Sequence, residues 1–119
     1  MSERRTEARK KVMAFTPVHD LEKKMLLGYL GDLTMKGAMV IGAKPMEVGK
    51  QFILKIEFQD ELPGITTKRM IIPVRVVRCT RDESPNSYKI GFEFTDVEPE
   101  HKQIIEALLE RYHFRHKMF

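Results

Sequence analysis

Two short segments contain the residues whose types and spacing best suit ligand chemistry. Arg5 and Arg9 lie four residues apart near the N-terminus, directly after Arg4, and residues 32–37 read Asp-Leu-Thr-Met-Lys-Gly. An arginine side chain presents its donors as a planar fork, which can meet two acceptors of a guanine edge or of a phosphate at once. Asp32 can accept hydrogen bonds from guanine N–H groups, which arginine cannot do. Together the segments favour a guanine-bearing, phosphorylated ligand.

The second segment is expected to form a turn, because it lies between two apolar stretches. Asp and Thr side chains bond to backbone two residues on and shape such turns. Gly37 permits either a positive φ or a close approach of the backbone to a ligand. Arg5 and Arg9 are at most about 13 Å apart in an extended segment and face the same way in a helical one. One segment can therefore contact two parts of one ligand.

Composition limits the class of protein. The chain has 119 residues, of which 42% are hydrophobic and 32% charged, values typical of one globular domain. No apolar run approaches a membrane-spanning length, and no secretory signal precedes the basic start. The single cysteine, Cys79, excludes an internal disulfide and fits a reducing compartment. We therefore expect a cytoplasmic protein with no membrane insertion.

The net charge of +4 is concentrated at the two ends of the chain. Residues 1–11 carry five basic and two acidic side chains, and residues 111–119 carry three basic side chains and no acid, so the stretch between them is slightly acidic. DNA-binding domains usually spread a basic stripe over one face. A basic tail suits a small anion, an arm on nucleic acid or an acidic partner.

Apolar periodicity predicts six strands followed by a helix. The expected strands are 12–18, 24–33, 38–43, 51–58, 68–80 and 88–95. The inward-facing sets are expected to be Met25, Leu27, Tyr29 and optionally Leu33 in the second strand, Phe52, Leu54, Ile56 and Phe58 in the fourth, and Tyr88, Ile90, Phe92 and Phe94 in the sixth. Pro73 indicates an edge position or a bulge. Six regularly spaced strands favour a small antiparallel barrel or sandwich.

The helix is expected over 98–112. Pro99 suits its first position, with Asp96 as an alternative cap to Glu98. Its apolar stripe consists of Ile104, Ile105, Leu108, Leu109 and Tyr112. We interpret 1–119 as one domain, made of a flexible basic arm over 1–11, a barrel over 12–95 and this helix, with a frayed tail from His113 onward.

The order of these features resembles the PilZ domain family. Four features resemble the family: an RxxxR motif at Arg5 and Arg9, a DxTxxG motif from Asp32 to Gly37, the strand sequence Ile-Gly-Phe-Glu-Phe at 90–94 and a C-terminal helix directly after it. The resemblance implies a mostly β fold: a six-stranded antiparallel barrel with a C-terminal helix. It also implies binding of cyclic di-GMP, a bacterial second messenger. Thr34 departs mildly from the commoner serine.

By resemblance, the ligand-binding residues would be Arg4, Arg5, Arg9, Asp32, Thr34 and Gly37. The arginines would contact guanine edges and phosphates, Asp32 and Thr34 would hydrogen-bond a guanine, and Gly37 would keep the shape of the turn. A basic residue at position 4 tends to accompany a stacked ligand pair in the family, so two cyclic di-GMP molecules per chain are expected. The output would be a contact with an effector protein.

Other functions receive less support from the residues. The sequence contains no nucleophile–base pair, no phosphate-binding glycine loop and no clustered metal ligands, so we expect neither catalysis nor a metal or cofactor. A small barrel binding RNA or single-stranded DNA is the alternative, but such barrels stack bases on exposed aromatics, and only 8% of residues are aromatic. A PilZ-like interaction protein without nucleotide binding is a third possibility.

Overall fold

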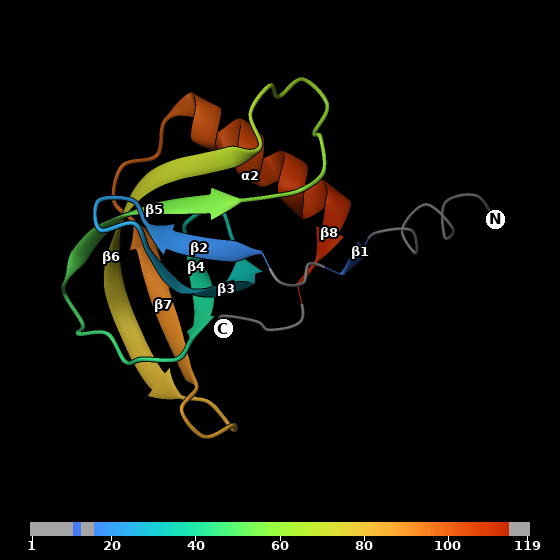
Figure 1. Ribbon diagram of the computed structural model, residues 1–119. Coiled ribbons are helices and arrows are strands. Elements are labelled where there is room, and N and C mark those ends of the chain that lie inside the picture. Colours follow the sequence, from blue (N-terminus) through green and yellow to red (C-terminus); the bar gives the residue numbers. More distant parts are fainter. Residues whose placement is uncertain (1–10, 13–15, 115–119) are drawn as a thin grey trace.

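The computed structural model describes residues 11–12 and 16–114, and most of them form a closed six-stranded barrel (Figure 1). The strands follow around the barrel in the order β2, β3, β4, β7, β6, β5, and every neighbouring pair is antiparallel. Their bounds are Pro17–Asp20 (β2), Met25–Leu33 (β3), Gly37–Gly42 (β4), Gln51–Glu57 (β5), Arg69–Arg81 (β6) and Tyr88–Phe94 (β7). The barrel with a C-terminal helix predicted from the sequence is confirmed.

Strict alternation fills the barrel from β5 and β7. Leu54 and Ile56 on β5, and Ile90 and Phe92 on β7, are almost completely buried, as their period of two predicts. The inward sets expected for these strands are confirmed, with the end residues Phe52 and Tyr88 only partly buried.

The inward set expected for β3 is wrong at Met25 and Tyr29 and right at Leu33, while Leu27 is partly buried against the core. Met25 and Tyr29 are exposed, whereas Leu30 and Leu33 belong to the core. The register of β3 with β4 shifts between Leu30 and Asp32, so Gly31 is an extra residue on β3. Such a bulge breaks the period of two and lets residues three apart point into the same core.

Two expected strands differ in detail from the structure. The first begins later than predicted, and the longest, β6, pairs with β7 only after Pro73. Strand β2 starts at Pro17, and residues 13–15 lie outside the described part of the chain. In β6, pairing with β7 starts at Val74, next to Pro73, so the missing N–H of Pro73 lies where the ladder ends. The bulge of β6 lies between Val76 and Arg78 instead.

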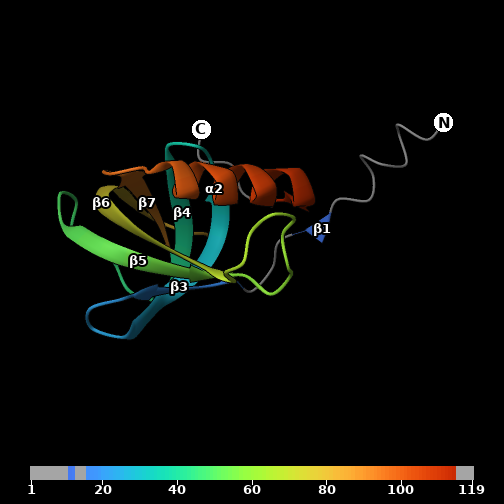
Figure 2. The same cartoon turned by 90° about the horizontal axis from the view of Figure 1, so that it is seen from above.

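Helix α2 (Pro99–Arg111) closes one end of the barrel, as Figure 1 shows from the side and Figure 2 from above. Pro99 is its first residue and Glu98, not Asp96, is its N-cap. The Glu98 N–H donates to His101 Nδ1 at 2.9 Å, and His101 Nε2 donates to the Ile71 carbonyl at 2.8 Å, in the part of β6 that pairs with β5 but not with β7. These two bonds require a neutral ring with its proton on Nε2.

The predicted apolar stripe of α2 packs into the barrel core. Ile105 and Leu108 are fully buried and Ile104 nearly so, while Leu109 is partly buried. The helix ends at Arg111, one residue before the expected end, and Tyr112–His113 form strand β8. His113 therefore belongs to a strand and not to a frayed tail.

Candidate functional site

Thr34 organises the turn between β3 and β4. Its Oγ1 accepts hydrogen bonds from the N–H groups of Lys36 and Gly37, both at 3.1 Å, and lies 3.3 Å from the Gly37 carbonyl, to which it donates. The Thr34 N–H donates to the same carbonyl at 2.9 Å. A hydroxyl has one donor and two acceptor positions, so all of its capacity is used inside the turn. Thr34 therefore fixes the turn's shape in this structure.

Asp32 precedes the turn on the outer face of the barrel. The bulge at Gly31 turns it outward, because the next residue, Leu33, is buried in the core. Asp32 Oδ1 accepts a hydrogen bond from the Leu33 N–H at 2.9 Å. This bond orients the carboxylate group.

Position 37 has room only for a glycine, because strand β7 packs directly against it. The φ of Gly37 is not positive, and a Cβ built on it would stand 2.2 Å from the Phe92 carbonyl oxygen. Real Cβ atoms do not come so close to another backbone. Of the two reasons that the sequence offered for this glycine, a positive φ does not apply. The close approach exists, and the partner that the structure contains is strand β7.

Four residues in register form a row across the outer face beside this turn. Asp32 on β3 pairs with Met39 on β4, Met39 pairs with Gly91 on β7, and Gly91 pairs with Arg78 on β6. Strands lie about 4.8 Å apart, so the row spans roughly 14 Å from the carboxylate residue to the guanidinium residue. A Cβ on Gly91 would be 3.4 Å from the Arg78 Cβ. Because Gly91 has no side chain, nothing projects from the sheet surface at this position of the row.

Met39 is unusual within this row. It is only 6% exposed, although it lies outside the core cluster and its neighbours Ala38 and Val40 point inward. Sequence reasoning missed the row, because it depends on the register between strands that are not consecutive in the chain. The one sequence signal was Gly91, a glycine inside a strand that otherwise alternates apolar and polar residues.

The basic N-terminal segment is anchored beside the end of α2. Strand β1 (Lys11–Val12) pairs in parallel with β8, Lys11 with Tyr112 and Val12 with His113. Lys11 was expected to belong to a flexible arm, and it is instead part of this small sheet. Arg4, Arg5 and Arg9 lie outside the described residues.

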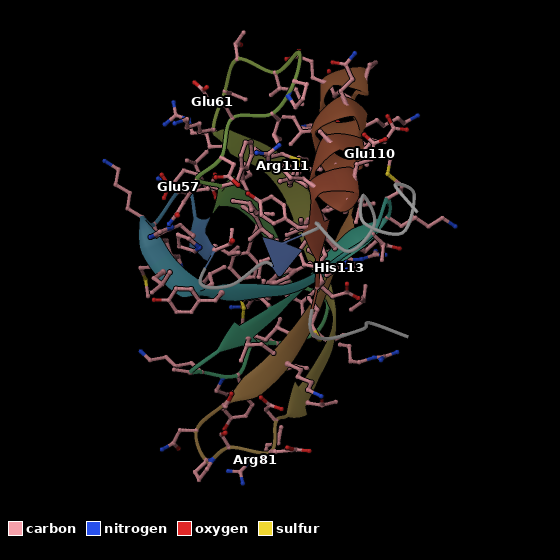
Figure 3. The ribbon with its side chains drawn as sticks, turned by 90° about the vertical axis from the view of Figure 1, so that its right-hand side faces the viewer. Glu57, Glu61, Arg81, Glu110, Arg111 and His113 are labelled. Carbon is pink, nitrogen blue, oxygen red and sulfur yellow. The ribbon has the colours of Figure 1, made fainter. Side chains whose placement is uncertain are left out.

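A polar cluster holds this anchoring point. The Tyr112 hydroxyl and Arg111 Nε both donate to Asp60 Oδ2, the latter at 3.4 Å. Burial raises the pKa of Tyr112 to about 12, and the hydrogen bond and charge of Asp60 act in the same direction. The phenol therefore stays protonated and ties β8 to the loop between β5 and β6. Figure 3 shows this side of the molecule, with Arg111 and His113 at the end of α2 and Arg81 at the far tip of the barrel.

Two further findings concern the described residues alone. No helix among them is both long and apolar enough to cross a membrane. No group of three or more His, Cys, Asp or Glu side chains in the described ranges could hold a metal ion.

Comparison with known families agrees with this architecture. A search of curated proteins finds no match to the sequence. The family model described as PilZ domain matches residues 3–111, all but ten of the 119 residues, and this range includes both arginine positions of the RxxxR motif and the whole Asp32–Gly37 turn. PilZ domains are non-catalytic receptors, typically of cyclic di-GMP. Because the match covers the barrel and the whole of helix α2, the chain belongs to the PilZ domain family.

Proposed function

We propose that this protein is a receptor for cyclic di-GMP that binds the nucleotide between its basic N-terminal segment and the Asp32–Gly37 turn. The observation that carries the proposal is the turn itself. Thr34 and Gly37 hold its backbone in one shape, and Asp32 stands beside it on the outer face, where its carboxylate is the type of group that accepts hydrogen bonds from guanine N–H groups. A preformed acceptor site reduces the entropy lost on binding.

Arg5 and Arg9 supply the complementary chemistry. Asp32 serves the donor edge of a guanine, and a guanidinium serves its O6/N7 edge or a phosphate. The pairing of β1 with β8 fixes the chain only two residues after Arg9. In our proposal this anchor keeps the arginine segment close to the barrel, and the bound ligand supplies the negative charge that the segment lacks.

A nucleic-acid-binding barrel receives no comparable support. Barrels of that kind need several aromatic side chains on one exposed face. Tyr29 is the single aromatic among the large hydrophobic side chains that are exposed in the described part of the chain. We therefore propose a small-molecule receptor in the cytoplasm, whose ligand-dependent contact with an effector protein transmits the signal.

Arginine variants test the proposed contacts. Arg5→Ala and Arg9→Ala should each weaken cyclic di-GMP binding by roughly tenfold or more, because each removes a charge-assisted, two-pronged contact. Arg81→Ala is the matched control, since Arg81 is an exposed arginine at the far tip of β6 (Figure 3). Isothermal titration measures all three affinities. Equal affinities for the three variants and the wild type would refute the proposed roles.

The number of bound ligands is a separate proposal, and it depends on Arg4. Two stacked cyclic dinucleotides bring four negative charges into one site, and a third guanidinium can offset part of their repulsion. We propose two ligands per chain and expect Arg4→Leu to shift the titration endpoint toward one. A wild-type endpoint of one ligand per chain would contradict this proposal.

A further inference from the structure

An apolar groove lies at the N-terminal half of β3, away from the proposed nucleotide site. It encloses about 340 Å³, and its apolar lining comes from Met25, Leu26 and Tyr29 on one side and Ile41 and Met46 on the other. Met25, Leu26 and Tyr29 are 49%, 48% and 42% exposed, and they are half of the six large hydrophobic side chains exposed in the described ranges. Apolar side chains gathered in this way mark an interaction site.

Two glycines form the floor of this groove. A Cβ on Gly28 would stand 2.1 Å from the Ile41 carbonyl oxygen, and one on Gly42 would stand 2.4 Å from that of Leu27. Strands β3 and β4 therefore approach closely at this point, and no side chain rises from the floor. The registered pairing of β3 with β4 begins at Tyr29, so residues 25–28 continue past the end of that ladder.

Hydrogen bonds fix the walls of the groove. The Met46 N–H donates to Cys79 Sγ at 3.4 Å, which ties the β4–β5 loop to β6. The Asp82 N–H donates to the Ser87 carbonyl at 2.8 Å and closes the β6–β7 loop, whose residues Asn86 and Ser87 also line the groove. A hollow with anchored walls is a preformed binding site, and a preformed site loses less entropy when it is occupied.

The charged side chain in the lining of the groove is positive. Lys44 is the one charged residue in its lining, and no carboxylate lines it. Lys23 and Lys24 lie in the turn directly before Met25, where Asp20 Oδ1 accepts from the Glu22 and Lys23 N–H groups and holds the turn. Glu22 is the one acid of that turn. The occupant that matches this groove therefore carries apolar side chains together with carboxylates.

We propose that the groove binds a short peptide segment of a partner protein, rich in apolar and acidic residues. A concave site with fixed walls fits a peptide better than a flat bilayer, which requires a protruding apolar surface. The inference rests on the proposed function, because a non-catalytic receptor acts through its contacts. Figures 1 and 2 place the β2–β3 turn and the β4–β5 loop on the side of the barrel away from β1 and β8, so the partner would contact a different side of the barrel from these two strands.

Selection from a display library of short linear peptides tests the composition of the occupant. Peptides selected on the full chain should be enriched in apolar and acidic residues. Leu26→Glu should weaken their binding by roughly tenfold or more, because it places a carboxylate in the apolar wall. Val48→Glu is the matched control, since Val48 is 59% exposed and does not line the groove. Basic peptides, no selected peptides, or equal losses in both variants would overturn the proposal.

A charge exchange tests the role of Lys44. Lys44→Glu should weaken the selected acidic peptides, and replacing their acidic residues with lysine should restore binding to this variant. Failure of the exchange would remove the argument from charge and overturn the choice of an acidic partner. Thermal unfolding of each variant shows that the fold is retained, which is expected because Leu26 and Lys44 are exposed.

Two other occupants are outcomes of the same experiment. Sedimentation that shows a dimer, lost in Leu26→Glu, would assign the groove to a second copy of this chain. Binding of vesicles containing an anionic lipid, lost in the same variant, would assign it to a membrane surface. Either result would overturn the peptide proposal. Titration of cyclic di-GMP into Leu26→Glu separates the two proposals, because nucleotide binding should be unchanged whether or not peptides bind.

Discussion

The two ends of strand β3 are built in different ways. At its C-terminal end, Asp32 and Thr34 engage backbone groups of the turn, and Gly37 lies against β7 with no room for a side chain. At its N-terminal end, Met25 and Leu26 stand half exposed above a glycine floor. Polar side chains bonded to the backbone hold the shape of the turn, whereas exposed apolar side chains gain from being covered. The same strand therefore carries a rigid turn and an open groove.

Among the substitutions at the C-terminal end of β3 and its turn, Gly37→Ala should lower the free energy of unfolding most. The added Cβ would stand 2.2 Å from the Phe92 carbonyl oxygen, so β4 and β7 must separate. We expect the free energy of unfolding to fall by about 3 kcal/mol, as in other overpacked sites. Urea denaturation measures this loss.

Gly91→Ala is the matched control for that substitution. Its Cβ would meet the Arg78 Cβ at 3.4 Å, an ordinary contact, so the free energy of unfolding should change little. If the row from Asp32 to Arg78 faces the nucleotide, Gly91→Ala should instead weaken cyclic di-GMP binding. Equal losses of stability in the two variants would contradict the explanation given for Gly37.

Polar and apolar exchanges compare the two ends of β3 directly. Thr34→Val leaves the Lys36 and Gly37 N–H groups without their acceptor and should lower the free energy of unfolding by about 1–3 kcal/mol. Thr34→Ser keeps the hydroxyl and should restore most of this loss. Leu26→Thr, at the groove, should change stability by no more than about 0.5 kcal/mol, because Leu26 is exposed. A larger loss from Leu26→Thr than from Thr34→Val would reverse the comparison.

The bond between Tyr112 of β8 and Asp60 predicts a smaller effect on stability, which depends on pH. Folding raises the pKa of Tyr112 from 10.0 to about 12, so the native state favours the protonated phenol. The corresponding stabilisation is complete below pH 10 and is lost as the pH rises toward 12. Denaturation across this interval should show a steeper loss of stability in the wild type than in Tyr112→Phe. Parallel curves for the two proteins would show that Tyr112 is not coupled to folding.

The sequence predicted the elements whose apolar pattern is regular. Alternation in β5 and β7 and the helical stripe from Ile104 to Leu108 gave the right core faces, because each pattern has one period throughout. The inward face of β3 was wrong at Met25 and Tyr29, and the extra residue Gly31 changes the phase of the alternation within the strand. A bulge of one residue leaves no distinct periodic signal in so short a segment.

The candidate site was predictable only in part. The Asp32–Gly37 motif indicated the turn, but the packing of Gly37 against β7 depends on a strand more than fifty residues later in the chain. The pairing of Lys11 with Tyr112 could not be predicted, because a two-residue strand has no period. The row through Met39, Gly91 and Arg78 depends on the register between β4, β7 and β6, which the individual strand sequences do not specify.

Isothermal titration of the wild-type protein with cyclic di-GMP, at moderate salt and beside linear GMP, tests the central proposal most directly. The proposed receptor should bind the cyclic dinucleotide with a saturable heat and bind the linear mononucleotide far more weakly, because only the former presents guanine and phosphate groups to the arginine segment and the turn together. Binding should also raise the melting temperature, since the ligand stabilises the folded state. No heat and no thermal stabilisation at high concentrations of cyclic di-GMP would contradict the proposal.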